Sequence, residues 1–379
     1  MRHNIHKNSQ RIYYVILLAL TCFFIFHSIV INPALPDFES YRAIYEFGGE
    51  GFTWKGATAF TGLITVCHRL GVDYIWFRII LKFLSVVILI IALRLILKRV
   101  IKEGFIIYKC RADSLLVFLL VFFATYLFAF EFYEIQIRAG LAISFALLSF
   151  ALFMSGPRKL KLIYKLCAIL AAIIALGTHE WTSLVLLYVL FLPMLLARIY
   201  RFIEKRISFE SHTMFMMFVS MLLILSSLFI LYKISTIATL VRGEHLFSPL
   251  NPIRFAFFSI FTILYGLFTL PFLTLRVVNY HLTSPDQSDK SFNKYRLPLP
   301  FVDKFKMFLF MNYFAFAISL AVFYALDILH GSGEAIVRVY TLFTPAFLIG
   351  TLFQDKIVSR FFLLILVGNG LFFLNTVFF

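Results

Sequence analysis

Charged residues are scarce in this sequence. Only 14% of the chain is charged and 61% is hydrophobic, whereas a soluble domain is about a quarter charged and close to half apolar. Apolar runs of about 17–25 residues, the length that crosses the hydrocarbon core of a bilayer, recur along the whole chain. The composition therefore excludes an ordinary soluble domain. It predicts an all-α, polytopic integral membrane protein.

The motifs of common enzyme sites are also missing. The sequence has no glycine-rich phosphate loop, no HExxH pair and no nucleophile elbow. The four cysteines show neither disulfide nor metal-ligand spacing and are interpreted as packing residues; they are Cys22, Cys67, Cys110 and Cys167. We therefore expect no metal and no cofactor.

Acidic residues are fewer than basic ones, 19 against 35, and the net charge is +16. In a soluble protein this excess of basic residues would suggest a nucleic-acid partner. Here the basic residues are concentrated in the loops between predicted spans. With the N-terminus in the cytoplasm, most lysines and arginines fall in cytoplasmic loops, and the opposite side is nearly neutral. The pattern predicts a membrane protein with a cytoplasmic N-terminus, in contact with membrane lipids and with no nucleic-acid partner.

The apolar runs predict about 10–12 transmembrane helices in a single membrane domain, 1–379. The predicted spans are roughly 12–31, 75–97, 114–131, 136–154, 162–178, 182–198, 213–232, 254–275, 307–328, 336–353 and 360–378. Segment 56–70 is only moderately apolar and is interpreted as a re-entrant or interfacial helix, or as an extra span. It lies within a predicted outer-side segment, 32–73, and 276–306 is predicted to be a cytoplasmic loop.

Five polar clusters remain after the cytoplasmic signals are removed, and all fall on the predicted outer side. They are 36–47, 130–138, 178–181, 241–254 and 330–340. Ionisable groups at membrane depth are costly and are candidates for function. We predict that the clusters form one site open to the outer aqueous side.

Arginines at the outer ends of spans are the first candidates. Arg138 and Arg338 each lie about one turn inside a predicted span, and a guanidinium fork suits phosphate or carboxylate. Snorkelling to lipid headgroups is the alternative. Arg242 and Arg254 lie in a loop and are weaker candidates. Glu134 lies four residues before Arg138 and is expected to pair with it or to bind hydroxyls.

A histidine follows the predicted span 162–178. Histidine as a residue type titrates near neutral pH, and His179 is a candidate to accept a proton from a sugar hydroxyl. Its neighbour Glu180 is expected to orient it or to act alone. The alternative is a hydrogen-bonded interfacial histidine beside a belt tryptophan, Trp181.

Asp37, Tyr41 and Tyr45 are spaced four residues apart. On a helix this spacing places them on one face. A carboxylate and two aromatic rings can bind a sugar through its hydroxyls and its C–H faces. The alternative is an amphipathic surface helix with tyrosine anchors.

Four short patches, taken in order, resemble the Wzy-type polymerases of bacterial surface polysaccharides, particularly the EpsG-like branch. The first is Pro36-Asp37 followed by Tyr41 and Tyr45. The others are IRAGLA at 137–142, THEW at 178–181 and RVYTLF at 338–343, which includes Tyr340. The order of predicted spans is similar over most of the chain. The sequence motifs are similar only in these four patches. In this family a small hydroxyl residue is expected directly after the histidine, whereas here Glu180 and Trp181 intervene.

The resemblance implies a metal-independent glycosyltransferase of GT-C architecture that polymerises repeat units on the periplasmic face. The donor would be a growing glycan on undecaprenyl diphosphate, and the acceptor a single lipid-linked repeat. A chain-length regulator is a candidate protein partner. Arg138 and Arg338 would bind the diphosphate, His179 or a carboxylate (Asp37 or Glu180) would be the base, and the tyrosines would position sugar.

Three other classes stay open. An O-antigen ligase performs the same chemistry on a different acceptor but usually has a large periplasmic loop. A flippase or exporter of lipid-linked glycans is expected to have cations inside its spans. Lys82 is one such cation, since it lies in the predicted span 75–97. A membrane O-acyltransferase is expected to hold a histidine deep in a span, and His27 lies near the outer end of its span.

Overall fold

The computed structural model describes residues 15, 19, 38–49, 58–102, 118–123, 125–126, 133, 136–155, 160–203 and 342. The helices of this part are α2 (Phe38–Glu46), α3 (Thr58–Arg69), α4 (Tyr74–Lys102), α6 (Ile137–Ser155), α7 (Lys161–Thr178) and α8 (Glu180–Ile203). The chain divides into two compact units, Met1–Leu187 with Asp355–Phe379, and Tyr188–Gln354. Each of these helices lies in the first unit, except α8, which crosses the boundary.

Three of the predicted spans are confirmed as helices long and apolar enough to cross a membrane. They are Tyr74–Arg99, Ile137–Ser155 and Lys161–Thr178, against predictions of 75–97, 136–154 and 162–178. The predicted span 182–198 is helical within α8, whose shorter apolar stretch is Glu180–Leu192. The all-α membrane class therefore holds for the described residues. The remaining predicted spans and loop 276–306 lie wholly or mostly outside them.

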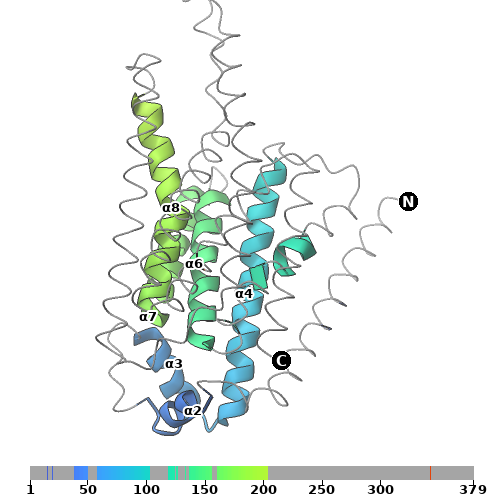
Figure 1. Ribbon diagram of the computed structural model, residues 1–379, viewed down its shortest axis with the longest axis vertical. Coiled ribbons are helices and arrows are strands. Elements are labelled where there is room, and N and C mark those ends of the chain that lie inside the picture. Colours follow the sequence, from blue (N-terminus) through green and yellow to red (C-terminus); the bar gives the residue numbers. More distant parts are fainter. Residues whose placement is uncertain are drawn as a thin grey trace, which may run out of the picture. The chain divides into compact units, whose positions relative to one another are not determined.

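Helix α6 packs between α4 and α7 (Figure 1). Its buried small residues include Ala139, Gly140, Ala142 and Ala146. Small side chains let helix backbones approach closely in a membrane, where apolar burial alone does not drive association. The sequence of α6 is thus suited to the central position.

Helix α7 buries one narrow face and exposes the other. Ala168, Ala171 and Ala175 recur at helical spacing on the buried face, whereas Leu166, Ile169, Leu170 and Ile173 are among the exposed apolar residues. In a membrane span such a face is suited to contact lipid. Cys167 is exposed as well, so the prediction that every cysteine packs in the core is wrong for this residue, while Cys67 is buried.

Helices α4 and α6 run in the same direction. Near their far ends the Ser155 Oγ donates a hydrogen bond to the Leu95 carbonyl at 3.3 Å. Near their beginnings Phe77 and Leu81 of α4 share one core cluster with Ile137 and Leu141 of α6. The hydrogen bond and the core cluster together show that α4 and α6 pack in parallel.

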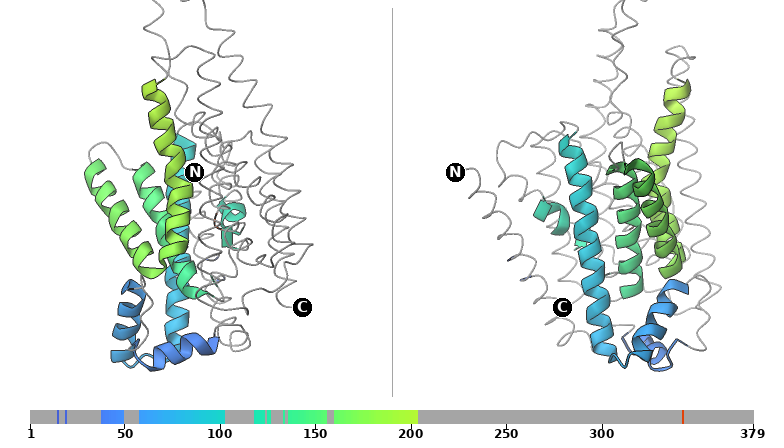
Figure 2. Two further views of the ribbon diagram at one scale, coloured as in Figure 1. Left: turned by 60° about the vertical axis from the view of Figure 1, so that its left-hand side comes forward. Right: turned by 180° about the vertical axis from the view of Figure 1, so that it is seen from behind.

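Helices α2 and α3 lie at the end where α4 and α6 begin (Figure 2). Helix α3 has 12 residues and is about 18 Å long, too short for a core of about 30 Å. The described helix is thus shorter than a membrane span, and whether segment 56–70 is re-entrant, interfacial or an extra span stays a prediction. Helix α3 packs against α2 and α7.

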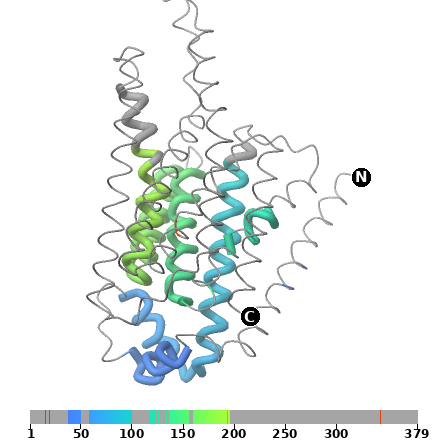
Figure 3. The backbone as a smooth tube through the Cα atoms, in the orientation of Figure 1, coloured from blue at the N-terminus to red at the C-terminus, as the bar shows by residue number. Residues whose placement is uncertain are grey.

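Glycine turns end α2 and α3, whose places in the backbone trace Figure 3 shows. Gly48 and Gly49 have positive φ after α2, and Gly71 after α3. The Gly48 N–H donates to the Tyr45 carbonyl at 2.9 Å and the Gly49 N–H to the Ile44 carbonyl at 3.0 Å, the Schellman pattern. Asp73 then caps α4, because its Oδ2 accepts the Ile75 N–H at 3.1 Å.

Candidate functional site

Three of the five predicted outer clusters reach the same end of the first unit in the described residues. Arg138 is the second residue of α6, and His179 directly follows α7. Because α6 and α7 are consecutive, packed helices, the start of one lies at the end of the other. Gly177 also meets α3 there, since a Cβ added to it would lie 3.0 Å from the Ala59 Cβ.

Arg138, in the first turn of α6, is partly buried, with its Nε inside the protein. The carbonyl of Gln136 accepts the N–H groups of Ala139 at 2.7 Å and Gly140 at 3.2 Å, and so starts the helix. A helix N-terminus carries partial positive charge and favours an anion. Side-chain charge and helix dipole therefore have the same sign at this position.

His179 separates α7 from α8 in an extended conformation, with φ −151° and ψ 98°. Its N–H donates to the Ala175 carbonyl at 3.0 Å, and its carbonyl accepts the Ser183 N–H at 3.1 Å. Its ring Nδ1 accepts the Thr182 N–H at 3.4 Å. The imidazole therefore acts as the N-cap of α8.

This contact favours one tautomer of a neutral His179 ring. An Nδ1 atom that accepts a hydrogen bond holds no proton, so a neutral ring carries its hydrogen on Nε2. In this arrangement His179 presents an N–H donor. A general base, by contrast, needs an available lone pair.

The residues after His179 differ in their surroundings. Glu180 is exposed at the first position of α8, where a carboxylate is favoured by the helix dipole. Thr182 and Ser183, the hydroxyl residues that follow Trp181, are buried. Glu180 is thus the exposed charged group beside His179.

Tyr41 and Tyr45 share one face of α2, as their spacing predicted, and both are buried. The Tyr45 ring packs on Phe77 with centroids 4.6 Å apart, and its hydroxyl donates to the Val72 carbonyl. Burial, with smaller contributions from Cys67 and Asp73, raises the pKa of Tyr45, so the phenol keeps its proton. The observed role of both rings is packing, and sugar contact stays a prediction.

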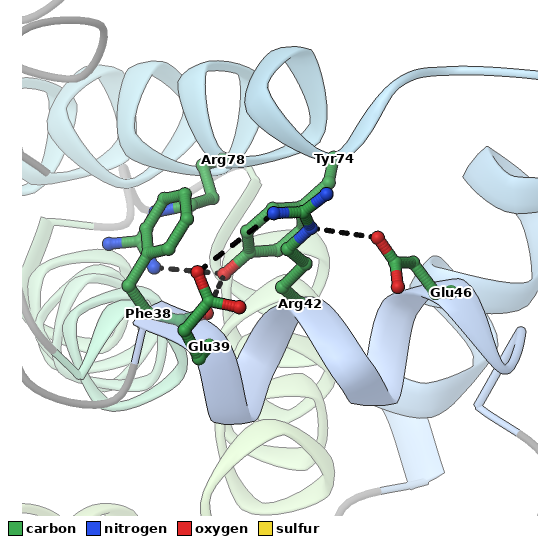
Figure 4. Close-up of polar contacts among 6 residues, drawn as sticks. All are labelled: Phe38, Glu39, Arg42, Glu46, Tyr74 and Arg78. Atoms are coloured by element: carbon green, nitrogen blue, oxygen red, sulfur yellow. Dashed lines mark hydrogen bonds and ion pairs between the residues drawn. The ribbon is translucent and has the colours of Figure 1, made fainter. Parts of the chain in front are cut away.

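Arg78 is a site candidate that the sequence argument missed. It is 1% exposed on α4. Its Nη1 donates to the Tyr74 hydroxyl at 3.0 Å, and that hydroxyl donates to the Phe38 carbonyl at 3.0 Å (Figure 4). Its Cζ also lies 5.0 Å from the centre of the Phe38 ring, a cation–π contact.

The Arg78 network links the beginning of α2 to α4. The neighbouring ion pair is exposed, with the Arg42 Nε 2.8 Å from the Glu46 Oε1. A signal for Arg78 was present in the sequence. An arginine inside an apolar span is a candidate by default, and Lys82 follows it by four residues.

Six predicted site residues lie outside the described residues, namely Asp37, Glu134, Arg242, Arg254, Arg338 and Tyr340. Their proposed roles stay predictions. Within the described ranges no group of three or more His, Cys, Asp or Glu is placed to hold a metal ion.

Comparison of the chain with protein-family models, with curated proteins and with solved structures finds no match.

Proposed function

We propose that this chain is a membrane glycosyltransferase that polymerises oligosaccharide repeat units carried on undecaprenyl diphosphate, at the periplasmic face of a bacterial inner membrane. The observation that carries the proposal is the placement of Arg138 and His179. They come from different helices and lie at the same end of the first unit, beside the exposed carboxylate of Glu180. An arginine for a phosphate, a donor and a carboxylate are the groups that glycosyl transfer from a lipid diphosphate requires.

In the proposed reaction the acceptor hydroxyl oxygen bonds to the anomeric carbon of the donor glycan. The bond from that carbon to the phosphate oxygen breaks, and the lipid diphosphate leaves with the electron pair. Arg138, with Arg338 as a second candidate, stabilises the negative charge that develops on the phosphates. The hydroxyl proton passes to a carboxylate, either Glu180 or Asp37. His179 donates a hydrogen bond from its Nε2–H to the reacting groups and keeps its proton.

The cap on α8 allows the role of His179 to be tested. His179→Asn keeps an oxygen that can accept the Thr182 N–H, whereas His179→Ala removes the cap and costs about 1 kcal/mol of stability. We expect the Asn variant to fold as the parent does and to keep a reduced ladder of long polymer on a gel. A complete loss of polymer in a stable Asn variant would assign the base role to the histidine ring itself.

The proposed function is tested by the length distribution of the surface polysaccharide in the host, with and without the gene. We expect deletion to remove the long ladder while a single repeat is still displayed, because units cross the membrane but are not joined. Accumulation of long lipid-linked polymer outside would indicate a ligase. An unchanged ladder would contradict the polymerase, the ligase and the flippase alike.

A flippase or exporter of lipid-linked glycans is the second candidate, and one observation favours it. Arg78 and Lys82 are both buried inside a membrane-length helix, where a transporter would place cations. The same deletion separates the two functions. Loss of all displayed units, with lipid-linked material accumulating inside, would favour the flippase.

A further inference from the structure

Helix α3 begins against the last turn of α7, beneath it in Figure 1, and the two backbones come close together. A Cβ added to Gly177 would lie 3.0 Å from the Cβ of Ala59, and 3.4 Å from both the Ala59 backbone nitrogen and the Thr58 Oγ1. Carbon atoms in favourable contact are about 3.5–4.0 Å apart. The approach of α3 therefore leaves no room for a side chain at position 177.

The two helix ends that meet at this contact carry opposite partial charges. Helix α7 ends at Thr178, and the carbonyl groups of its last turn give that end partial negative charge. Helix α3 begins at Thr58, and its first N–H groups give that end partial positive charge. Electrostatic attraction grows as charges approach, so the absence of a side chain at Gly177 strengthens the contact.

The beginning of α3 is anchored by the residue that follows Ala59. Phe60 is 1% exposed, and its ring centroid lies 6.1 Å from that of Tyr41 in α2 and 6.3 Å from that of Phe77 in α4. The Thr65 Oγ1 also donates a hydrogen bond to the Gly48 carbonyl at 3.2 Å. These contacts hold α3 in place, so crowding at position 177 would displace the end of α7.

The end of α7 leads directly into His179, two residues after Gly177. The Nδ1 atom of His179 accepts the Thr182 N–H at 3.4 Å, longer than the usual 2.7–3.2 Å between nitrogen and its acceptor. Relief of the crowding requires a movement of a few tenths of an ångström, which is enough to break so long a hydrogen bond. The orientation of the imidazole is therefore sensitive to the position of the last turn of α7.

We propose that Gly177, through its close contact with Ala59, positions His179 in the candidate site. Gly177 is a positioning residue, since it has no side chain to touch substrate and acts through the backbone of α7. The inference rests on the proposed function for the role of His179, and it makes α3 a part of the same site. Helix α3 holds the end of α7 where the Nδ1 atom caps α8 and the Nε2–H is presented to substrate.

The test compares Gly177→Ala with Gly62→Ala in the full-length chain. Both glycines lie in helices, where alanine has the higher propensity, but a Cβ added to Gly62 meets nothing within 4 Å. Gly62→Ala is therefore the matched control for the change of residue type. A third variant combines Gly177→Ala with Ala59→Gly, which moves the methyl group from α3 to α7 and restores the space between the helices.

Three properties are measured for each variant. The melting temperature in detergent reports on the fold, and the polysaccharide ladder in the deletion strain reports on chain extension. The tautomer of His179 is measured by NMR of protein with nitrogen-15 in its histidines, at a pH where the ring is neutral. The His179 signal is assigned by its absence from His179→Asn. A glycine needed only for packing would leave the tautomer unchanged.

We expect Gly177→Ala to melt close to the parent temperature and to make about 10–100-fold less long polymer, the effect of a displaced catalytic group. Its His179 ring should lose the preference for a proton on Nε2, because Nδ1 no longer accepts the Thr182 N–H. The variant with both changes should recover the ladder and the tautomer together. Gly62→Ala should match the parent in all three measurements.

Several results would overturn the proposal. One is an unchanged tautomer in Gly177→Ala, and another is a ladder of parental length. A large fall in the melting temperature together with loss of the ladder would identify a contact that holds the fold. Failure of Ala59→Gly to restore Gly177→Ala would show that crowding against α3 is not the cause. An equal loss of polymer in Gly62→Ala would have the same consequence.

The inference and the proposed function fail in distinguishable ways. If gene deletion removes the long ladder but Gly177→Ala keeps both the ladder and the tautomer, the polymerase function stands and the contact has no part in it. If deletion leaves the ladder unchanged, the polymerase function fails. A tautomer that changes in Gly177→Ala and recovers with Ala59→Gly would still show that the contact positions His179.

Discussion

Arg138→Ala is expected to abolish chain extension while the protein remains in the membrane. The side chain lies at the N-terminus of α6, where its charge and the helix dipole both favour an anion. Removing one preorganised donor to developing negative charge costs about 100–1,000-fold in rate. The measurement is the polysaccharide ladder in a deletion strain that expresses the variant, with the amount of membrane protein determined in parallel.

Arg42→Ala is the matched control for Arg138→Ala. Arg42 lies at the same end of the fold, in the exposed ion pair with Glu46, and exposed pairs contribute little. It should leave the ladder unchanged. Arg138→Lys should rescue poorly, because an ammonium cannot replace a bidentate guanidinium contact. Full-length polymer from Arg138→Ala would remove the diphosphate assignment and leave the residue as a lipid-headgroup anchor.

Tyr45→Ala is expected to destabilise the protein by about 3–5 kcal/mol, as the loss of a large buried aromatic side chain does. The ring is 3% exposed and packs on Phe77. Tyr45→Phe keeps the ring and loses the hydrogen bond to the Val72 carbonyl, at about 1 kcal/mol. Thermal unfolding in detergent and the polysaccharide ladder are measured for both variants.

The two substitutions separate packing from sugar binding. A packing role predicts that Tyr45→Phe keeps the long ladder and that Tyr45→Ala loses it together with the fold. Phe47→Ala is the control, since Phe47 follows α2 and is 69% exposed, and it should change stability little. A stable Tyr45→Phe variant without polymer would show that the hydroxyl contacts substrate.

Three described helices of the first unit could be predicted from the sequence. The ends of α4, α6 and α7 fall within a few residues of the predicted spans, because a bilayer demands apolar segments of fixed length with internally paired backbones. The helical face shared by Tyr41 and Tyr45 was likewise predicted from spacing alone. Span length and the shared face of a helix depend on the local order of residues. They can be predicted without knowing which other helices pack nearby.

The candidate site could be predicted only in part. The positions of Arg138 and His179 at one end follow from counting spans. The contact by which Nδ1 of His179 caps α8 depends on the backbone conformation between α7 and α8. No sequence pattern predicted that conformation. Thr182 and Ser183 are also interior, because the start of α8 decides which side of the helix they occupy.

The sequence by itself determined the class of this protein, the length of its spans and the residue types at their ends, because hydrophobic thickness and loop charge act on the chain locally. Tertiary structure alone decided that α3 packs beneath α7, that the tyrosines of α2 are core and that Arg78 and Lys82 point inward. In a helix that is apolar on every side, the 3.6-residue periodicity shows which residues share a face. It does not show which helix, or lipid, that face contacts. Packing against α2 and α6 makes that choice.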